Sequence, residues 1–110
     1  MRRVIVETPF AGDVMRNILY IHACIRDCFM RNEAPFASHA FYTQDGILDD
    51  KIPRERALGM EAGFAWGEVA EATVVYTDYG ILAGMQEGIN RALAAGRPVE
   101  YRKLYSNAAS

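Results

Sequence analysis

Residues 72–102, ATVVYTDYGILAGMQEGINRALAAGRPVEYR, decide the fold of this chain. The first six residues are small or β-branched with one aromatic, which predicts a buried strand. From about Ala83 the apolar positions recur at helical spacing, and Gly96 suits the position just beyond a helix C-terminus. Residues 98–101 predict the next strand. A strand, turn, helix and strand in this order predict a parallel pair joined by a right-handed crossover.

The turn at residues 78–80 is the first place to look for function. It lies at the carboxyl end of a predicted strand and faces the N-terminus of the following helix. Small anionic or hydroxylated ligands bind at such places in parallel α/β sheets.

The remainder of the chain continues the same alternation. Residues 3–7 predict a first strand and residues 34–38 a short second strand, while Pro53 suits the first turn of a second helix. We therefore expect one α/β domain spanning residues 1–110, with a small, mostly parallel, four- or five-stranded Rossmann-like sheet flanked by helices. The first helix should begin after Asp13 as its N-cap and bury one apolar stripe, formed by Val14, Ile18, Ile21, Ile25 and Phe29.

Composition narrows the class of protein. The chain is 51% hydrophobic and 24% charged, which is typical of a globular protein, and its net charge of −2 gives no basic surface for nucleic acid. No apolar run approaches the roughly 20 residues of a membrane span, and the first apolar stretch is too short for a signal peptide. We expect a cytoplasmic protein with no membrane or nucleic-acid partner. Cys24 and Cys28 share one helical face, which favours reduced core thiols over a disulfide or zinc site, and we expect neither a metal nor a cofactor.

Several polar or aromatic residues fall where the strands should end, and their convergence is what makes them candidates. An arginine on the opening turn of a helix can bind a phosphate bidentately, which favours Arg16. Each residue also has a plainer interpretation: Asp13 as a cap alone, His39 as a satisfied half-buried side chain, Arg16 as a solvated residue, Tyr42 and Phe10 as loop packing. The candidate ligand-binding residues are Pro9, Phe10, Gly12, Asp13, Arg16, Asn17, His39, Tyr42, Asp78, Gly84 and Met85.

The sequence resembles the nucleoside 2-deoxyribosyltransferase-like superfamily. The resemblance rests on PFAGD followed by RN, then H with YTQ, then the strand, turn and GM helix, and it covers residues 4–102. The nearer similarity is to a small branch that is frequent in phage and bacterial genomes. The motifs are moderately specific for fold and ligand class and weakly specific for activity.

The resemblance implies cleavage or exchange of the N-glycosidic bond of deoxynucleosides or their 5′-monophosphates. The family uses a glutamate nucleophile on the helix after the third strand and an acidic residue on the preceding helix. The nucleophile position falls on Gly88, with Glu87 one residue away, and the acidic position falls on Gly63, with Glu61 two residues away. Leu82 stands where a phosphate-loop serine often occurs. Glu87 and Glu61 are therefore the candidate catalytic residues.

Two glycines at carboxylate positions favour a retained pocket that holds a nucleotide-like molecule with lost or altered catalysis. In a phage, by analogy of fold alone, such a pocket could sequester a cyclic or ADP-ribose-type immune signal. The alternative is an active N-glycosidase or 2-deoxyribosyltransferase with Glu87 as nucleophile. A third possibility is a structural or interaction protein with an empty crevice.

The segment GMEAGFAWG at residues 59–67 predicts a homo-oligomer. Large apolar residues alternate with glycines there, and the resemblance points the same way because family members complete their pockets with a neighbouring subunit. The interface should include Met60, Phe64 and Trp66; the plainer interpretation is an ordinary core helix.

Overall fold

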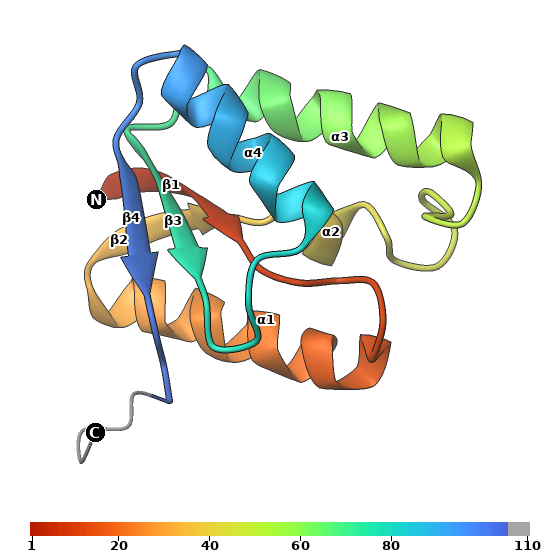
Figure 1. The fold of residues 1–110 in the computed structure, drawn as a ribbon, viewed down its shortest axis with the longest axis horizontal. Coiled ribbons are helices and arrows are strands. Elements are labelled where there is room, and N and C mark those ends of the chain that lie inside the picture. The colour runs from red at the N-terminus through yellow and green to blue at the C-terminus, as the bar shows by residue number, and fades with distance from the viewer. Residues whose placement is uncertain (106–110) are drawn as a thin grey trace.

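The computed structural model describes residues 1–105 and shows a four-stranded, all-parallel sheet with helices on both faces (Figure 1). The strand order is β2-β1-β3-β4, with a parallel register in each of the three pairs. This confirms the predicted α/β class. The elements are β1 Arg2–Glu7, α1 Val14–Met30, β2 Glu33–Phe36, α2 Ser38–Phe41, α3 Pro53–Gly67, β3 Ala72–Tyr76, α4 Ala83–Ala94 and β4 Val99–Arg102.

The helices divide between the two faces of the sheet. Helix α1 covers one face, and α3 and α4 lie together on the other (Figure 1). Successive side chains of a strand point to opposite faces, so Val4 and Val6 pack with α1 whereas Ile5 and Glu7 point toward α3 and α4. This alternation in β1 places a carboxyl group on the face that carries the pocket. None of the helices in residues 1–105 has the length and hydropathy needed to cross a membrane.

The helix boundaries follow the local signals. The Asp13 carboxylate accepts a hydrogen bond from the Arg16 backbone N–H at 3.1 Å, so it caps α1 as predicted. Pro53 is the first residue of α3, and Gly96, just beyond α4, has a φ of +71°. These three predictions are confirmed.

The predicted apolar stripe of α1 is wrong at both ends, because Val14 and Phe29 are 42% and 53% exposed. The buried face instead contains Asn17, Tyr20, Ile21, Cys24 and Cys28. Both cysteines are free thiols. Polar side chains can be buried here because they are hydrogen-bonded, Asn17 to the carbonyls of loop residues 10 and 11, and Tyr20 to the Asp78 carboxylate.

The second strand is also shorter than predicted. β2 ends at Phe36, and His39 lies in the one-turn helix α2 instead of directly at the strand end. The Tyr42 N–H donates to the Ser38 carbonyl at 2.8 Å, closing this turn. In α4, Leu93 is exposed, unlike the neighbouring predicted core positions Ile89 and Ala92.

A buried ion pair joins the two outermost strands on the α1 face. The Arg102 guanidinium of β4 donates to both carboxylate oxygens of Glu33 of β2, at 2.8 and 2.7 Å. Arg102 also donates to the Tyr76 hydroxyl at 3.2 Å, and Arg2 contacts Glu33 and Glu100 at 2.8 Å each. Hydrogen bonds from Arg102, together with those from Arg2, lower the pKa of Glu33 to about 2 despite its burial.

We predict that Glu33→Gln lowers the free energy of unfolding at pH 7 by about 1.5–3 kcal/mol, the scale of hydrogen bonds to a charged group, because Arg102 loses its buried carboxylate partner and keeps only the carboxylate of Glu100 at 3.0 Å. The ionised Glu33 stabilises the fold above its unfolded-state pKa of 4.5, and this contribution is lost as the pH falls toward about 2. The difference between native protein and variant should therefore narrow over that range in urea unfolding. Glu71→Gln, which removes an exposed pair with Arg3, is the control and should change stability little. Equal effects of the two variants would contradict the prediction.

Candidate functional site

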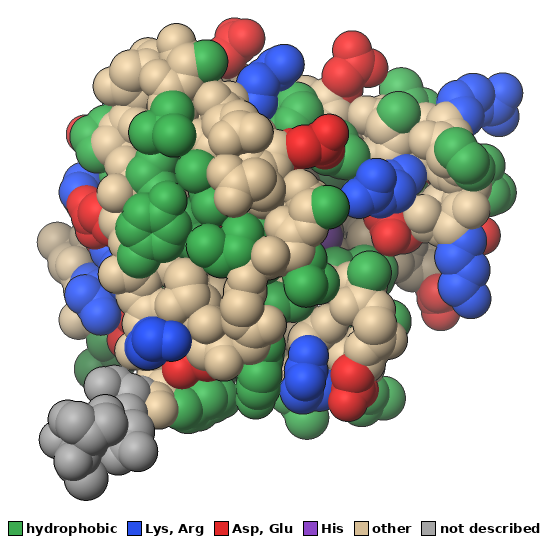
Figure 2. All heavy atoms as spheres, viewed as in Figure 1, with side chains coloured by type: hydrophobic (Ala, Val, Ile, Leu, Met, Phe, Trp, Pro, Cys, Tyr) green, Lys and Arg blue, Asp and Glu red, His purple; other side chains and the backbone are tan. Residues whose placement is uncertain are grey.

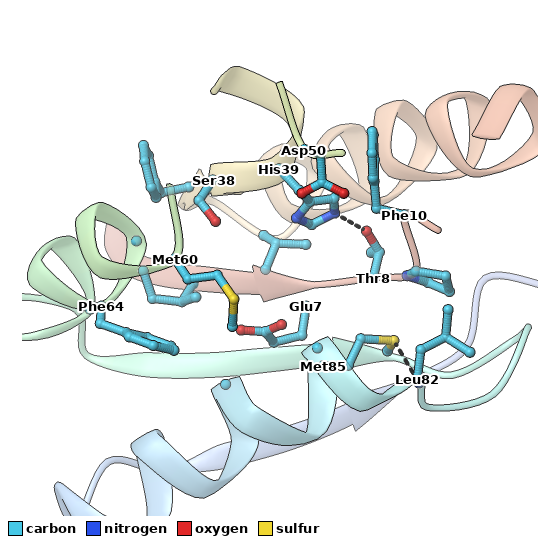
Figure 3. Close-up of a pocket in the computed structure, with 18 of the residues that line it drawn as sticks. Glu7, Thr8, Phe10, Ser38, His39, Asp50, Met60, Phe64, Leu82 and Met85 are labelled. Carbon is cyan, nitrogen blue, oxygen red and sulfur yellow. Dashed lines mark hydrogen bonds between the residues drawn. The ribbon is translucent and has the colours of Figure 1, made fainter. Parts of the chain in front are cut away.

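A cavity of about 140 Å³ opens between the sheet and the two helices α3 and α4, at the carboxyl end of β1. Figure 2 shows the surface hollowed between α4 and the segment that leads into α3, with charged side chains of both signs around the start of α3. Inside, aromatic and methionine side chains alternate with polar and charged groups (Figure 3). The side chains that characterise it are those of Glu7, Thr8, Phe10, Ser38, His39, Met60, Phe64 and Met85.

The glycines of α3 let this helix pack closely against the elements around the cavity. Gly59, Gly63 and Gly67 recur every four residues and so share one face of the helix. A side chain at these positions would meet Leu48, Ser38 and Arg97, respectively.

Glu7 is the polar group at the centre of the cavity. As the last residue of β1 it points between Met60 of α3 and Met85 of α4 (Figure 3). No hydrogen bond within residues 1–105 involves its carboxyl group. Burial away from water raises the pKa of Glu7 to about 8, although the nearby Arg97 charge opposes the shift. Glu7 therefore holds its proton at neutral pH.

Gly88 of α4 and Glu7 are fitted to one another. A Cβ atom on Gly88 would lie 2.0 Å from Oε2 of Glu7 and 2.5 Å from its Cδ. The carboxyl group of Glu7 thus occupies the space where a side chain at position 88 would begin. The other glycine at an expected carboxylate position behaves similarly, because a Cβ on Gly63 would lie 2.9 Å from Oγ of Ser38.

His39 and Thr8 form the second polar element of the wall. The Thr8 hydroxyl and Nε2 of His39 are 2.6 Å apart and hydrogen-bonded (Figure 3). Burial lowers the pKa of His39 to about 4, so the imidazole is neutral at physiological pH. Phe10 meets the His39 ring edge-on, with ring centroids 6.2 Å apart.

Two arginines bring positive charge to the pocket. Arg97 is held at its inner end, donating to the Thr73 hydroxyl at 3.1 Å and to the Gly67 carbonyl at 2.8 Å. Arg56 lies at the mouth, where its Nη2 would be 3.4 Å from a Cβ on Gly84 in the first turn of α4. Asp50, also a lining residue, is 3.7 Å from Nε of Arg56.

The structure brings part of the predicted ligand set together. The residues that line the pocket include Pro9, Phe10, His39, Gly84 and Met85. Leu82, at the position where a phosphate-loop serine often occurs, also lines it. Tyr42 borders an adjacent hollow of about 50 Å³ that shares His39 and Met60 with the main cavity.

Other predicted ligand residues lie outside the pocket lining. Arg16 stacks on Tyr79 with its guanidinium carbon 4.0 Å from the ring centroid, and Gly12 and Asp13 are exposed at the start of α1. Buried Asn17 does not line the pocket but holds the loop that carries Phe10. Its Nδ2 donates at 3.0 Å to each of two carbonyls in that loop. Asp78 holds the chain after β4, accepting from two backbone N–H groups at 2.8 and 2.9 Å.

The two predicted catalytic carboxylates, Glu87 and Glu61, are exposed on α4 and α3, and neither lines the cavity. One residue of helix rotates a side chain by about 100°, which turns Glu87 away from the direction that Gly88 faces.

Sequence reasoning missed the carboxyl group that the pocket does contain. The available signal was a glutamate at the end of a strand, directly before Thr8 and Pro9, out of phase with inward-facing Val4 and Val6. It also missed Ser38, Asp50, Arg56 and Arg97, and it assigned Met60 and Phe64 to an oligomer interface although both line the cavity. Within residues 1–105 no group of three or more His, Cys, Asp or Glu side chains is arranged to hold a metal ion.

Comparison with known proteins defines the class. A family model described as "Domain of unknown function (DUF7768)" matches residues 2–102, so the chain belongs to that family. No curated protein matches the sequence.

The fold is similar to that of a 2-deoxyribosyltransferase from the psychrotolerant bacterium Bacillus psychrosaccharolyticus. The superposition has a TM-score of 0.66 and 14% sequence identity, and it covers 92% of this chain and 72% of the enzyme. This likeness establishes a deoxyribosyltransferase-like α/β fold.

We predict an energetic coupling between Glu7 and Gly88. Gly88→Ala should improve helix propensity by about 1 kcal/mol when Glu7 is Ala, but in the native background the added methyl must displace the Glu7 carboxyl group. The gain in the free energy of unfolding should thus be smaller in the native background, with a coupling of about 0.5–3 kcal/mol in a double-mutant cycle. Strict additivity of the two substitutions would show that the side chains do not compete for this space.

Proposed function

We propose that the pocket binds a nucleoside- or nucleotide-like small molecule, with the heterocyclic base inside the cavity and the sugar toward its mouth. The observation that carries this proposal is a cavity of about 140 Å³ that combines aromatic and methionine side chains with several polar groups. A cavity of roughly 150 Å³ holds one benzene-sized ring. Ligand sites typically combine such apolar walls with a few convergent polar groups.

Aromatic contacts and hydrogen-bonding groups are both available to a base. Phe10 and Phe64 supply aromatic rings against which a base can pack. Glu7, Ser38 and His39 line the same cavity and supply hydrogen-bonding groups. The fold similarity to a 2-deoxyribosyltransferase supports this ligand class by analogy. A cyclic or ADP-ribose-type nucleotide signal belongs to the same class, and a phage protein could sequester it by binding alone.

A phosphate on the ligand would be met at the pocket mouth. The N-terminal turn of α4 carries unsatisfied N–H groups, and Arg56 lies against that turn at Gly84. Arg56 thus has the role that the sequence suggested for Arg16, which is instead stacked on Tyr79.

Cleavage of an N-glycosidic bond is the second candidate function. The observation that favours it is the Glu7 carboxyl group, because a carboxyl group beside the reacting centre is the basic requirement of glycosyl transfer.

We predict that a panel of deoxynucleosides and their 5′-monophosphates contains ligands that raise the thermal midpoint of the protein, since binding to the native state stabilises it by mass action. Arg56→Ala should weaken monophosphate binding by about 1.5–3 kcal/mol, the scale of a charge-assisted hydrogen bond, and leave nucleoside binding nearly unchanged. Calorimetric titration measures both constants.

Arg26→Ala, on the exposed surface of α1, is the matched control. A loss on Arg16→Ala and none on Arg56→Ala would place the phosphate at α1. A panel without any stabilising member would contradict the proposed function.

We also propose a homo-oligomer that uses the outer face of α3. Leu58 and Trp66 are 51% and 56% exposed, and their spacing of eight residues puts them on one face of the helix. Met60 and Phe64 point into the pocket, so the proposed interface excludes them.

Light scattering at micromolar concentration should therefore give the mass of a dimer or larger species, and Trp66→Glu should reduce it to the monomer with an unchanged circular dichroism spectrum. Leu93→Glu, at an equally exposed apolar position on α4, should leave the mass unchanged. A monomeric native protein would refute the oligomer.

A further inference from the structure

The Glu7 carboxyl group has no hydrogen-bond partner among residues 1–105, yet it points into the centre of the pocket (Figure 3). A half-buried carboxyl group in mainly apolar surroundings is unfavourable for stability, because its interactions with water are only partly replaced. Neighbouring Arg97 is already committed to Thr73 and Gly67. This arrangement is typical of a group that completes its contacts with a ligand.

We propose that Glu7 is the acid–base residue of an N-glycosidic bond cleavage in this pocket, delivered from β1 into the space that Gly88 leaves open. The inference rests on the proposed function, because it requires that a nucleoside-like molecule binds with its base in the cavity. In this proposal Glu7 carries out the proton transfers. Gly88 is required because a side chain at position 88 would occupy the space of the Glu7 carboxyl group.

The protonation state of Glu7 supports the role of proton donor. Four other titratable or charged groups line the cavity. They are His39 of α2, Asp50 of the loop between α2 and α3, Arg56 of α3, and Arg97, which follows α4. His39 is neutral, because burial lowers its pKa to about 4. Of the positive charges, that of Arg97 lowers the pKa of Glu7, but desolvation outweighs it and leaves the value at about 8. An acid with such a pKa remains protonated at pH 7 and can donate.

The reaction balances with water as the only co-reactant. The bond between C1′ of the sugar and the base nitrogen breaks, its electron pair stays with the base, and the base takes the proton from Glu7. The oxygen of a water molecule bonds to C1′ and releases a proton that returns to the Glu7 carboxylate. The products are the free base and the sugar, and the carboxylic acid is regenerated.

His39 does not meet the requirements for the same role. It holds no transferable positive charge at neutral pH, and its Nε2 is engaged by the Thr8 hydroxyl at 2.6 Å. Glu87 and Glu61 are exposed and outside the pocket lining. Glu7 therefore combines a proton that it can donate at neutral pH with a carboxyl group that has no hydrogen-bond partner among residues 1–105.

The test is release of free base from each deoxynucleoside and 5′-monophosphate, followed by reversed-phase chromatography. The native protein should release base from at least one of them. Glu7→Gln should slow this release by at least about 100-fold, the lower end of general acid catalysis, while the ligand-induced rise in thermal midpoint persists. The turnover rate of the native protein should fall about tenfold per pH unit above about 8, where the proton donor is lost. The residual rate of Glu7→Gln should not show this fall.

Two further sets of variants separate catalysis from folding. Glu68→Gln, the same substitution at an exposed site at the end of α3, should release base at the native rate. Glu7→Ala removes the carboxyl group, and adding Gly88→Asp or Gly88→Glu returns one from α4. At least one of these double variants should regain ten-fold or more of the rate lost in Glu7→Ala, which no purely structural role of Glu7 would produce.

The outcomes distinguish the two levels of proposal. If no ligand in the panel stabilises the protein, the proposed function fails and this inference fails with it. If ligands bind but no base is released, or if release is unaffected by Glu7→Gln, only this inference is overturned. Loss of release in Glu87→Gln with retention in Glu7→Gln would assign the chemistry to the exposed α4 glutamate instead.

Discussion

The ion pair between Glu33 and Arg102 connects strands that are not neighbours in the sheet. β2 and β4 are its two edges, and the pair joins the start of one to the end of the other on the α1 face. This contact is possible only in a twisted sheet, and because both partners are buried, it penalises any arrangement that separates them. The ion pair thus stabilises, from the α1 face, the same sheet whose opposite face carries the pocket.

β1 serves both faces through simple alternation. Val4 and Val6 fill the core against α1, whereas Ile5 and Glu7 line the cavity under α3 and α4. The α1 face is densely filled and holds its polar side chains in hydrogen bonds, as for Asn17. The other face carries the cavity, beside which the glycines of α3 allow close packing against Leu48, Ser38 and Arg97. The division explains how a chain of 110 residues keeps a packed core and a ligand-sized cavity on opposite faces of one sheet.

The relation between Glu7 and Gly88 changes the meaning of the missing carboxylates. Considered on the helix alone, glycine at position 88 indicates a pocket without its acid. In three dimensions the space beside that glycine contains the carboxyl group of another strand, within 2.0 Å of where a Cβ would be. Gly63 and Ser38 show the same complementarity with a hydroxyl group. The Glu7 carboxyl group comes from β1 and the Ser38 hydroxyl group from α2, so a motif-based comparison of α3 and α4 does not detect them.

The sequence by itself determined the order of the four strands and the three long helices, because caps, turn residues and hydrophobic periodicity act locally; it did not predict the one-turn helix α2. Asp13, Pro53 and Gly96 each do at their position what their chemistry predicts. Only the tertiary structure decided which side chains share the pocket. The strand register and the rotation of each helix place Glu7 inside, Glu87 outside and Arg16 on Tyr79. A shift of one residue reverses the face of a strand or turns a helical side chain by about 100°, and local sequence signals do not fix such a shift.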